Sequence, residues 1–135
     1  MRITKDNIHK FIYGTIMNCD HYGITGIDYI PEGITSLLCL GNKLTNLPHL
    51  PEGLVVLNCY NNQLTELPKL PDNLKTLNCT DNNLTSLPKL PDSLIRLNCH
   101  NNNLPYIITT MEEIKKHNKL VKRKEILRIL SKICV

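Results

Sequence analysis

Five cysteines recur at a spacing of twenty residues, and cysteine is the residue type in this chain that is best suited to chemistry. A thiolate can act as a nucleophile or as a zinc ligand. A tetrahedral zinc site, however, needs four ligands that converge on one point, and a regular repeat places its residues in a row. Neighbouring strands also lie ~4.8 Å apart, which is wider than the Cβ separation of a disulfide. We therefore expect reduced, buried thiols that bind no metal and no cofactor: Cys19, Cys39, Cys59, Cys79 and Cys99.

One cysteine has acid and base neighbours in the sequence. Cys19, Asp20 and His21 are the residue types of a thiol nucleophile with its helpers. Cys19 is in phase with the inward-facing residues of the repeat, whereas Asp20 and His21 occupy outward positions, so the three should not converge. The same argument applies to Cys99 and its neighbour His100. We predict no catalytic residue and no enzymatic activity, and expect Cys134, the one cysteine outside the row, to be the most reactive.

The cysteines belong to a repeated unit that includes leucine and asparagine. Each regular unit begins with L-x-x-L-x-C-x-x-N-x-L. The alternation of Leu57 and Cys59 predicts a short strand with both side chains inward. Asn62 and its equivalents are expected to turn the chain and to satisfy buried backbone groups, forming a ladder. About five such units, in residues 14–109, predict a mainly β solenoid with a parallel sheet.

The second half of each unit contains two Leu-Pro pairs, as in LTELPKLPDN. Proline fixes its own φ and pushes the preceding residue into extended geometry. We therefore predict an extended, polyproline-like return path on the convex side, without a helix.

The ends of the chain are expected to cap this stack within a single domain, residues 1–135. Residues 1–13 contain apolar residues at helical spacing, with Asp6 as a candidate N-cap. Thr110 and Glu113 form a capping-box pattern at the start of a basic amphipathic helix over residues 110–135, which Asn118 could interrupt. This segment carries eight Lys/Arg against three Asp/Glu, whereas residues 1–109 carry eight against nine.

The repeat pattern resembles that of the leucine-rich-repeat family. The unit is similar to the twenty-residue repeat of bacterial type III effectors, in which L-P-x-L-P precedes L-x-x-L. Its Asn- and Cys-rich composition also resembles short repeat proteins of giant amoebal viruses. The resemblance covers roughly residues 14–107 and implies a parallel sheet on a concave face and a role in binding other proteins. Cysteine at the sixth position, where the family more often has leucine, is the main departure.

The outward strand positions are the candidate protein-binding residues. Leu38, Leu40, Val56 and Tyr60 form an apolar spot on an otherwise polar surface, a combination typical of partner contacts. The alternative concerns the asparagines at position five of each unit, counted from its first residue, such as Leu54: Asn18, Asn58, Asn78 and Asn98. These asparagines would only bond along the sheet, and exposed leucine would be ordinary surface. The complete set is Leu38, Leu40, Val56, Asn58, Tyr60, Thr76, Asn78, Arg96, Asn98 and His100.

The basic C-terminal helix leaves a second hypothesis open. It could cover the last repeat, self-associate, or bind an anionic membrane surface or nucleic acid with the repeats as scaffold. The absence of aromatic residues in this segment argues against nucleic acid. Reduced cysteines and a charged N-terminal segment predict a cytoplasmic location, which for an effector-like protein includes a host cytoplasm.

Overall fold

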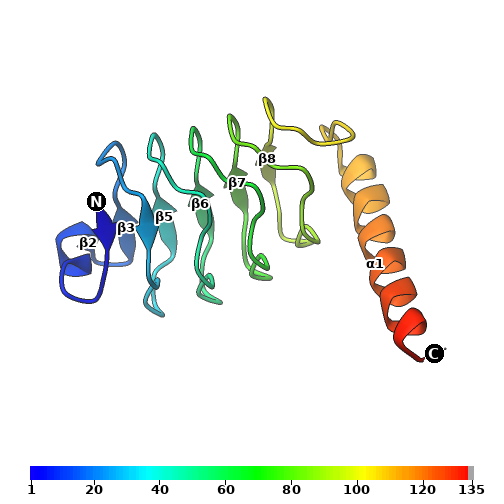
Figure 1. Ribbon diagram of the computed structural model, residues 1–135, viewed down its shortest axis with the longest axis horizontal. Helices are drawn as coiled ribbons and strands as arrows, with labels where there is room; N and C mark the ends of the chain where they lie inside the picture. The colour runs from blue at the N-terminus through cyan, green and yellow to red at the C-terminus, as the bar shows by residue number, and fades with distance from the viewer. Residues whose placement is uncertain (134–135) are drawn as a thin grey trace.

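The computed structural model describes residues 1–133, which form a stack of rungs that runs from left to right in Figure 1 and ends in a single long helix. The main sheet has the order β2-β3-β5-β6-β7-β8. Its five parallel strands are β3 (Ile16–Asn18), β5 (Ser36–Leu38), β6 (Val56–Asn58), β7 (Thr76–Asn78) and β8 (Arg96–Asn98). The predicted repeat solenoid with a parallel sheet is confirmed.

The twenty-residue period fixes the register of the sheet. Ser36 pairs with Val56, Val56 with Thr76, and Thr76 with Arg96. Equivalent residues of successive repeats are therefore neighbours across the sheet. Side chains at one repeat position form a row along the whole stack.

Leucine and cysteine side chains fill the core, as their phase predicted. Leu57, Leu77, Cys39, Cys59 and Cys79 are fully buried. In the Leu-Pro half of each unit the leucines face inward from the opposite wall, and residues 63–75 contain neither helix nor strand. The extended return path follows from the proline pairs, which disfavour helical geometry in the residue before each proline.

The predicted asparagine ladder is present. Asn62 Oδ1 accepts a hydrogen bond from Leu44 N at 3.0 Å, and its Nδ2 donates to the carbonyl groups of Cys39 at 2.9 Å and Cys59 at 3.2 Å. Asn82 repeats this arrangement one rung later. Each amide therefore joins its own turn to the preceding repeat and satisfies buried backbone groups that have no strand partner.

The residue before each ladder asparagine has a left-handed backbone. Asn61, Asp81 and Asn101 have φ values of 55°, 55° and 51°, and Gly41 has 66°. Asparagine, aspartate and glycine tolerate this region best, which explains the composition of this position. The position turns the chain out of the strand.

The N-terminal cap differs in detail from the prediction. β1 (Arg2–Ile3) pairs in parallel with β4 (Gly26–Ile27), and a 3₁₀ turn, η1, spans Ile8–Phe11. Asn7, and not Asp6, stands at the N-cap of η1. β2 (Ile12–Tyr13) then pairs antiparallel with β3 and ends the main sheet.

A single helix, α1 (Met111–Ile133), follows the repeats. Its capping box is confirmed: Thr110 N donates to Glu113 Oε2 at 2.9 Å, and Glu113 N donates to Thr110 Oγ1 at 3.2 Å. Asn118 does not interrupt the helix. Its side chain bonds to the repeats and not to the helix backbone. Asn118 Oδ1 accepts a hydrogen bond from Leu90 N, and Asn118 Nδ2 donates one to Leu90 O, both at 2.8 Å. Within residues 1–133 no helix has the length and hydrophobicity that a bilayer-spanning segment needs.

Candidate functional site

The solvent-facing side of the main sheet, here named the strand face, carries all ten predicted protein-binding residues. None of them is buried. Arg96, Asn98 and His100 on the last rung are exposed, and the remaining seven on the inner rungs are half-buried. The register places them in continuous rows, so Leu38 adjoins Asn58, and Asn58 adjoins Asn78. The structure therefore brings the predicted residues together on one surface; their role in binding stays a prediction.

The apolar part of the strand face extends beyond the predicted spot. Ile16 of β3 pairs with Ser36 and is 43% exposed, and Tyr13 of β2 pairs with Ile16 and is 75% exposed. A large aromatic side chain on an open sheet is a typical anchor for a partner. Tyr13 was missed because residues 1–13 were interpreted as a helical cap. Ile12 and Tyr13, a β-branched and an aromatic residue next to each other, were the available signal for a short strand.

The position-five asparagines bond along their own strand. Asn58 Oδ1 accepts from Tyr60 N at 3.3 Å, and Asn78 Oδ1 accepts from Thr80 N at 3.2 Å. Within the described residues their Nδ2 groups donate no hydrogen bond, which leaves them available to a partner. The side chain thus has two roles: its oxygen fixes the end of the strand and its nitrogen faces solvent.

Leu38 interrupts this asparagine row, and an acidic residue compensates. Asp20 Oδ1, on the preceding rung, accepts from Leu40 N at 2.7 Å. Leu40 N, which is equivalent to the Tyr60 N and Thr80 N groups that bond to asparagine, is therefore satisfied by Asp20. Leu38 can be apolar without leaving an unpaired backbone group.

The cysteine row is buried and its thiols are reduced. Cys39 and Cys59 Sγ each donate to the carbonyl oxygen of the next rung's position-five residue at 3.5 Å. Burial raises the pKa of Cys59 to about 12 and that of Cys39 well above its usual range. A thiol with so high a pKa is a poor nucleophile and metal ligand.

Cys19, Asp20 and His21 do not converge on a common site, as their phase in the repeat predicted. Burial, and secondarily the charge of Asp20, raises the pKa of Cys19 to about 12. Asp20 is committed to Leu40, and His21 is exposed with a φ of 60°. This arrangement supplies no activated nucleophile. In residues 1–133 no group of three or more His, Cys, Asp or Glu side chains could hold a metal ion; Cys134 lies outside the described residues.

The start of α1 is docked on the repeats by polar contacts. His117 is 2% exposed; its Nε2 lies 2.9 Å from Pro88 O, and its Nδ1 is bonded to the Tyr106 hydroxyl. Together with Asn118, these bonds fix the helix against the last full repeat. A His-Asn pair that docks a helix has no periodic signature, so the sequence did not reveal it.

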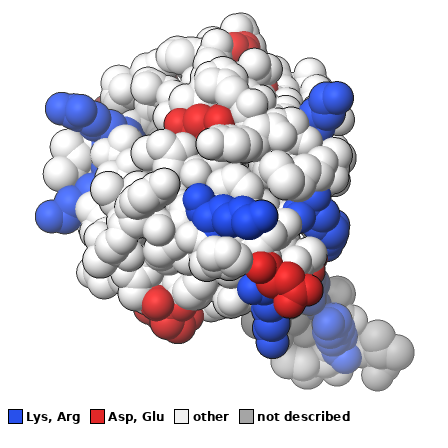
Figure 2. Space-filling model, turned by 90° about the vertical axis from the view of Figure 1, so that its left-hand side faces the viewer, with Lys and Arg blue, Asp and Glu red and all other residues white. Residues whose placement is uncertain are grey.

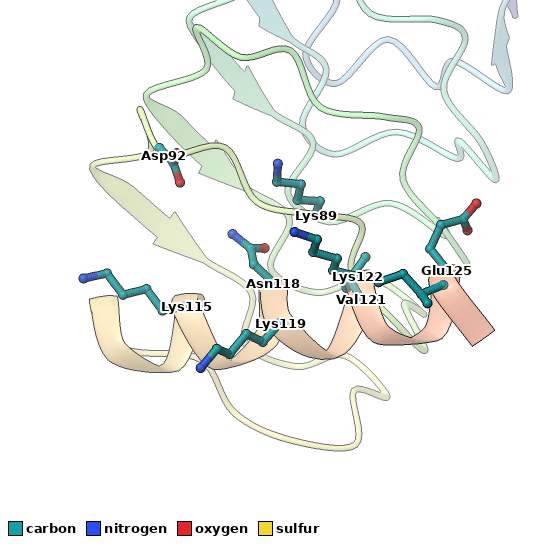
Figure 3. A pocket seen from close by; sticks show the side chains of 9 residues that line it. Lys89, Asp92, Lys115, Asn118, Lys119, Val121, Lys122 and Glu125 are labelled. Carbon is teal, nitrogen blue, oxygen red and sulfur yellow. The ribbon is translucent and has the colours of Figure 1, made fainter. Parts of the chain in front are cut away.

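A groove of about 550 Å³ lies between α1 and this repeat (Figure 3). In Figure 3, Asn118 points toward the repeats, Lys122 lies near Lys89, and Lys119 points away from the repeats. The groove is therefore basic on balance, with four lysines against two carboxylates: Lys89, Lys115, Lys119, Lys122, Asp92 and Glu125. The opposite end of the stack is different, since basic and acidic side chains there are scattered over a mainly uncharged surface (Figure 2).

The twenty-residue rung, the inward leucines and the asparagine ladder define a class of protein: the chain has the leucine-rich-repeat fold, in its short form. No protein-family model and no curated protein matches the sequence.

Several solved structures are similar to it, among them one from Shigella and one from Yersinia enterocolitica. The leucine-rich-repeat domain of a Shigella effector is 34% identical, with a TM-score of 0.69, over 81% of this chain and 49% of that one. YopM from Yersinia enterocolitica is 34% identical, with a TM-score of 0.66, over 69% of this chain and 21% of that one. The chain thus spans about half and about a fifth of the solved chains that it matches. The repeats are effector-like and of a kind that serves as a protein-interaction module.

Proposed function

We propose that this chain is a non-catalytic module that binds another protein on the strand face. The observation that carries the proposal is the continuous surface of Tyr13, Ile16, Leu38, Val56 and Tyr60, bordered by unused amide donors. Backbone hydrogen bonds between successive rungs hold the strands beneath it in place. A preformed surface loses little conformational entropy on binding.

The composition of the strand face suits a protein partner. Apolar and aromatic side chains form its N-terminal part, and Arg96 and His100 with the asparagines form a polar continuation. An apolar patch next to polar, solvent-accessible residues is the usual composition of a protein interface. A standard interface takes about 800 Å² from each partner, which five rungs can supply. The similarity to effector domains supports a cellular or host protein as partner, and the buried reduced thiols support a reducing compartment such as the cytoplasm.

The test is a pull-down that compares two double variants with the wild-type chain. Leu38→Asp/Tyr60→Ala removes the centre of the strand face, and we expect it to weaken capture of the partner by at least roughly 30-fold, because central aromatic anchors contribute 2 kcal/mol or more. Thr65→Asp/Glu66→Ala introduces the same two residue types at exposed positions of the return path and should bind as the wild type does.

Circular dichroism spectra of both variants must match the wild type. Equal binding by the Leu38→Asp/Tyr60→Ala variant, or loss in the Thr65→Asp/Glu66→Ala variant alone, would refute the strand face as the site.

A further inference from the structure

The apolar residues of α1 change sides halfway along the helix. In its first half the side toward the repeats carries Ile114, His117, Asn118 and Val121, which are buried or half-buried. At 3.6 residues per turn the same side continues as Lys124, Glu125, Arg128 and Lys132, all exposed. The second half of the helix therefore has no apolar surface to pack on the solenoid.

The opposite side of α1 has charged residues in its first half and aliphatic residues in its second half. We name this side the outer stripe. It begins with Glu112, whose carboxylate lies 3.6 Å from Lys116 Nζ, continues with Lys116, Lys119 and Arg123, and then carries four aliphatic residues. Leu127 and Ile133 are 64% and 70% exposed, and this part of the helix projects beyond the rungs (Figure 1). The outer stripe consists of Glu112, Lys116, Lys119, Arg123, Ile126, Leu127, Leu130 and Ile133.

The order of charge and hydrophobicity argues against a second copy as the occupant of the outer stripe. In a parallel pair of helices the two basic halves would repel each other. In a full-length antiparallel pair each basic half would cover the partner's aliphatic half. Neither arrangement gives the continuous apolar seam on which paired helices depend.

An anionic lipid surface satisfies both halves of the outer stripe. Lipid phosphates attract the lysines and the arginine, and the acyl region takes up aliphatic side chains without demanding a matching shape. Residues 110–133 contain no aromatic side chain of the sort that anchors protein interfaces or stacks on bases. Lys119 of the outer stripe also lines the edge of the basic groove and points away from the repeats (Figure 3).

We propose that the outer stripe of α1 binds anionic membrane surfaces, with its basic half at the phosphates and its aliphatic half in the acyl boundary. Binding leaves the strand face open, because the outer stripe faces away from the repeats. The chain would then present its protein-binding surface at a membrane. The proposal is independent of the strand-face function, and variants of the two surfaces separate them.

The test is co-sedimentation of the full chain with phosphatidylcholine vesicles, with and without phosphatidylserine. The wild type should bind only the phosphatidylserine vesicles, and added salt should weaken binding. Lys119→Ala/Arg123→Ala should lower the partition coefficient roughly 30-fold, since each cation near an anionic surface contributes about fivefold. Lys124→Ala/Lys132→Ala removes the same charge from the other side and should lower it less than about fivefold.

A third variant tests the aliphatic half. Leu127→Gln/Leu130→Gln should reduce partition by about tenfold or more while the helix content stays unchanged. Failure of the wild type to bind phosphatidylserine vesicles would overturn the proposal, as would equal effects of the two charge variants. Unchanged binding by the glutamine variant would show a purely electrostatic contact and would also overturn it. A wild-type dimer that this variant dissociates, without vesicle binding, would assign the outer stripe to self-association instead.

Discussion

Replacing Asn82 with alanine lowers the free energy of unfolding by about 3–5 kcal/mol, because three buried backbone groups then lose their partners. Asn82 Oδ1 accepts from Leu64 N at 3.0 Å, and its Nδ2 donates to Cys59 O at 3.0 Å and Cys79 O at 3.1 Å. Water cannot replace these bonds without opening the turn, since the side chain is 6% exposed. Urea denaturation followed by circular dichroism measures the change.

The neighbouring asparagine is the matched control for this substitution. The Asn83 side chain is exposed, and only its backbone takes part in the ladder, donating to Leu64 O at 2.9 Å. Asn83→Ala should change stability by no more than about 0.5 kcal/mol. If the two alanine variants were equally stable, the ladder would not be what holds the turns together.

Replacing Leu77 with alanine should cost about 3–5 kcal/mol, because it opens a cavity between two covering rungs. Leu77 is fully buried and pairs in register with Leu57 on one side and Leu97 on the other. The surrounding backbone is held by hydrogen bonds to both neighbours, so it can relax little into the space. The same denaturation experiment applies.

Leu97 occupies the equivalent position in the last rung and provides the comparison. It is only partly buried because no further rung covers it. Leu97→Ala should therefore cost about 1–2 kcal/mol, since part of the side chain is already in water. Equal losses at the two positions would contradict the view that stacking on both sides creates the core.

The features that the sequence predicted are those that repeat or act locally. A period of twenty residues brings equivalent positions together, so the inward cysteines, the ladder at Asn62 and the outward residues such as Tyr60 followed from phase alone. The capping box of Thr110 and Glu113 involves residues three apart and was equally visible.

The features that the sequence did not predict depend on single contacts between distant segments. Tyr13 joins the strand face only because β2 folds back on β3. Asn118 resembled a helix interruption, and its actual role depends on Leu90, 28 residues earlier. The sequence pattern predicts one amphipathic face for α1, whereas Val121 and Leu130 lie on opposite sides of the helix. Only the docking of the first half shows which side is free.

The inward direction of the five sulfur atoms is the claim on which the strand face depends, because alternate residues of each strand then point outward. Alkylation with iodoacetamide at pH 8, in native buffer and in denaturant, tests it directly when each cysteine is followed by peptide mass spectrometry. With the pKa of Cys59 raised to about 12, little thiolate is present at pH 8. Cys59 should then react about 1,000-fold more slowly in the native protein than in denaturant. Cys39 and Cys79, whose pKa values burial also raises, should be strongly protected as well. Native rates equal to the denatured rates at these three positions would show that the sulfurs face solvent and would contradict the account.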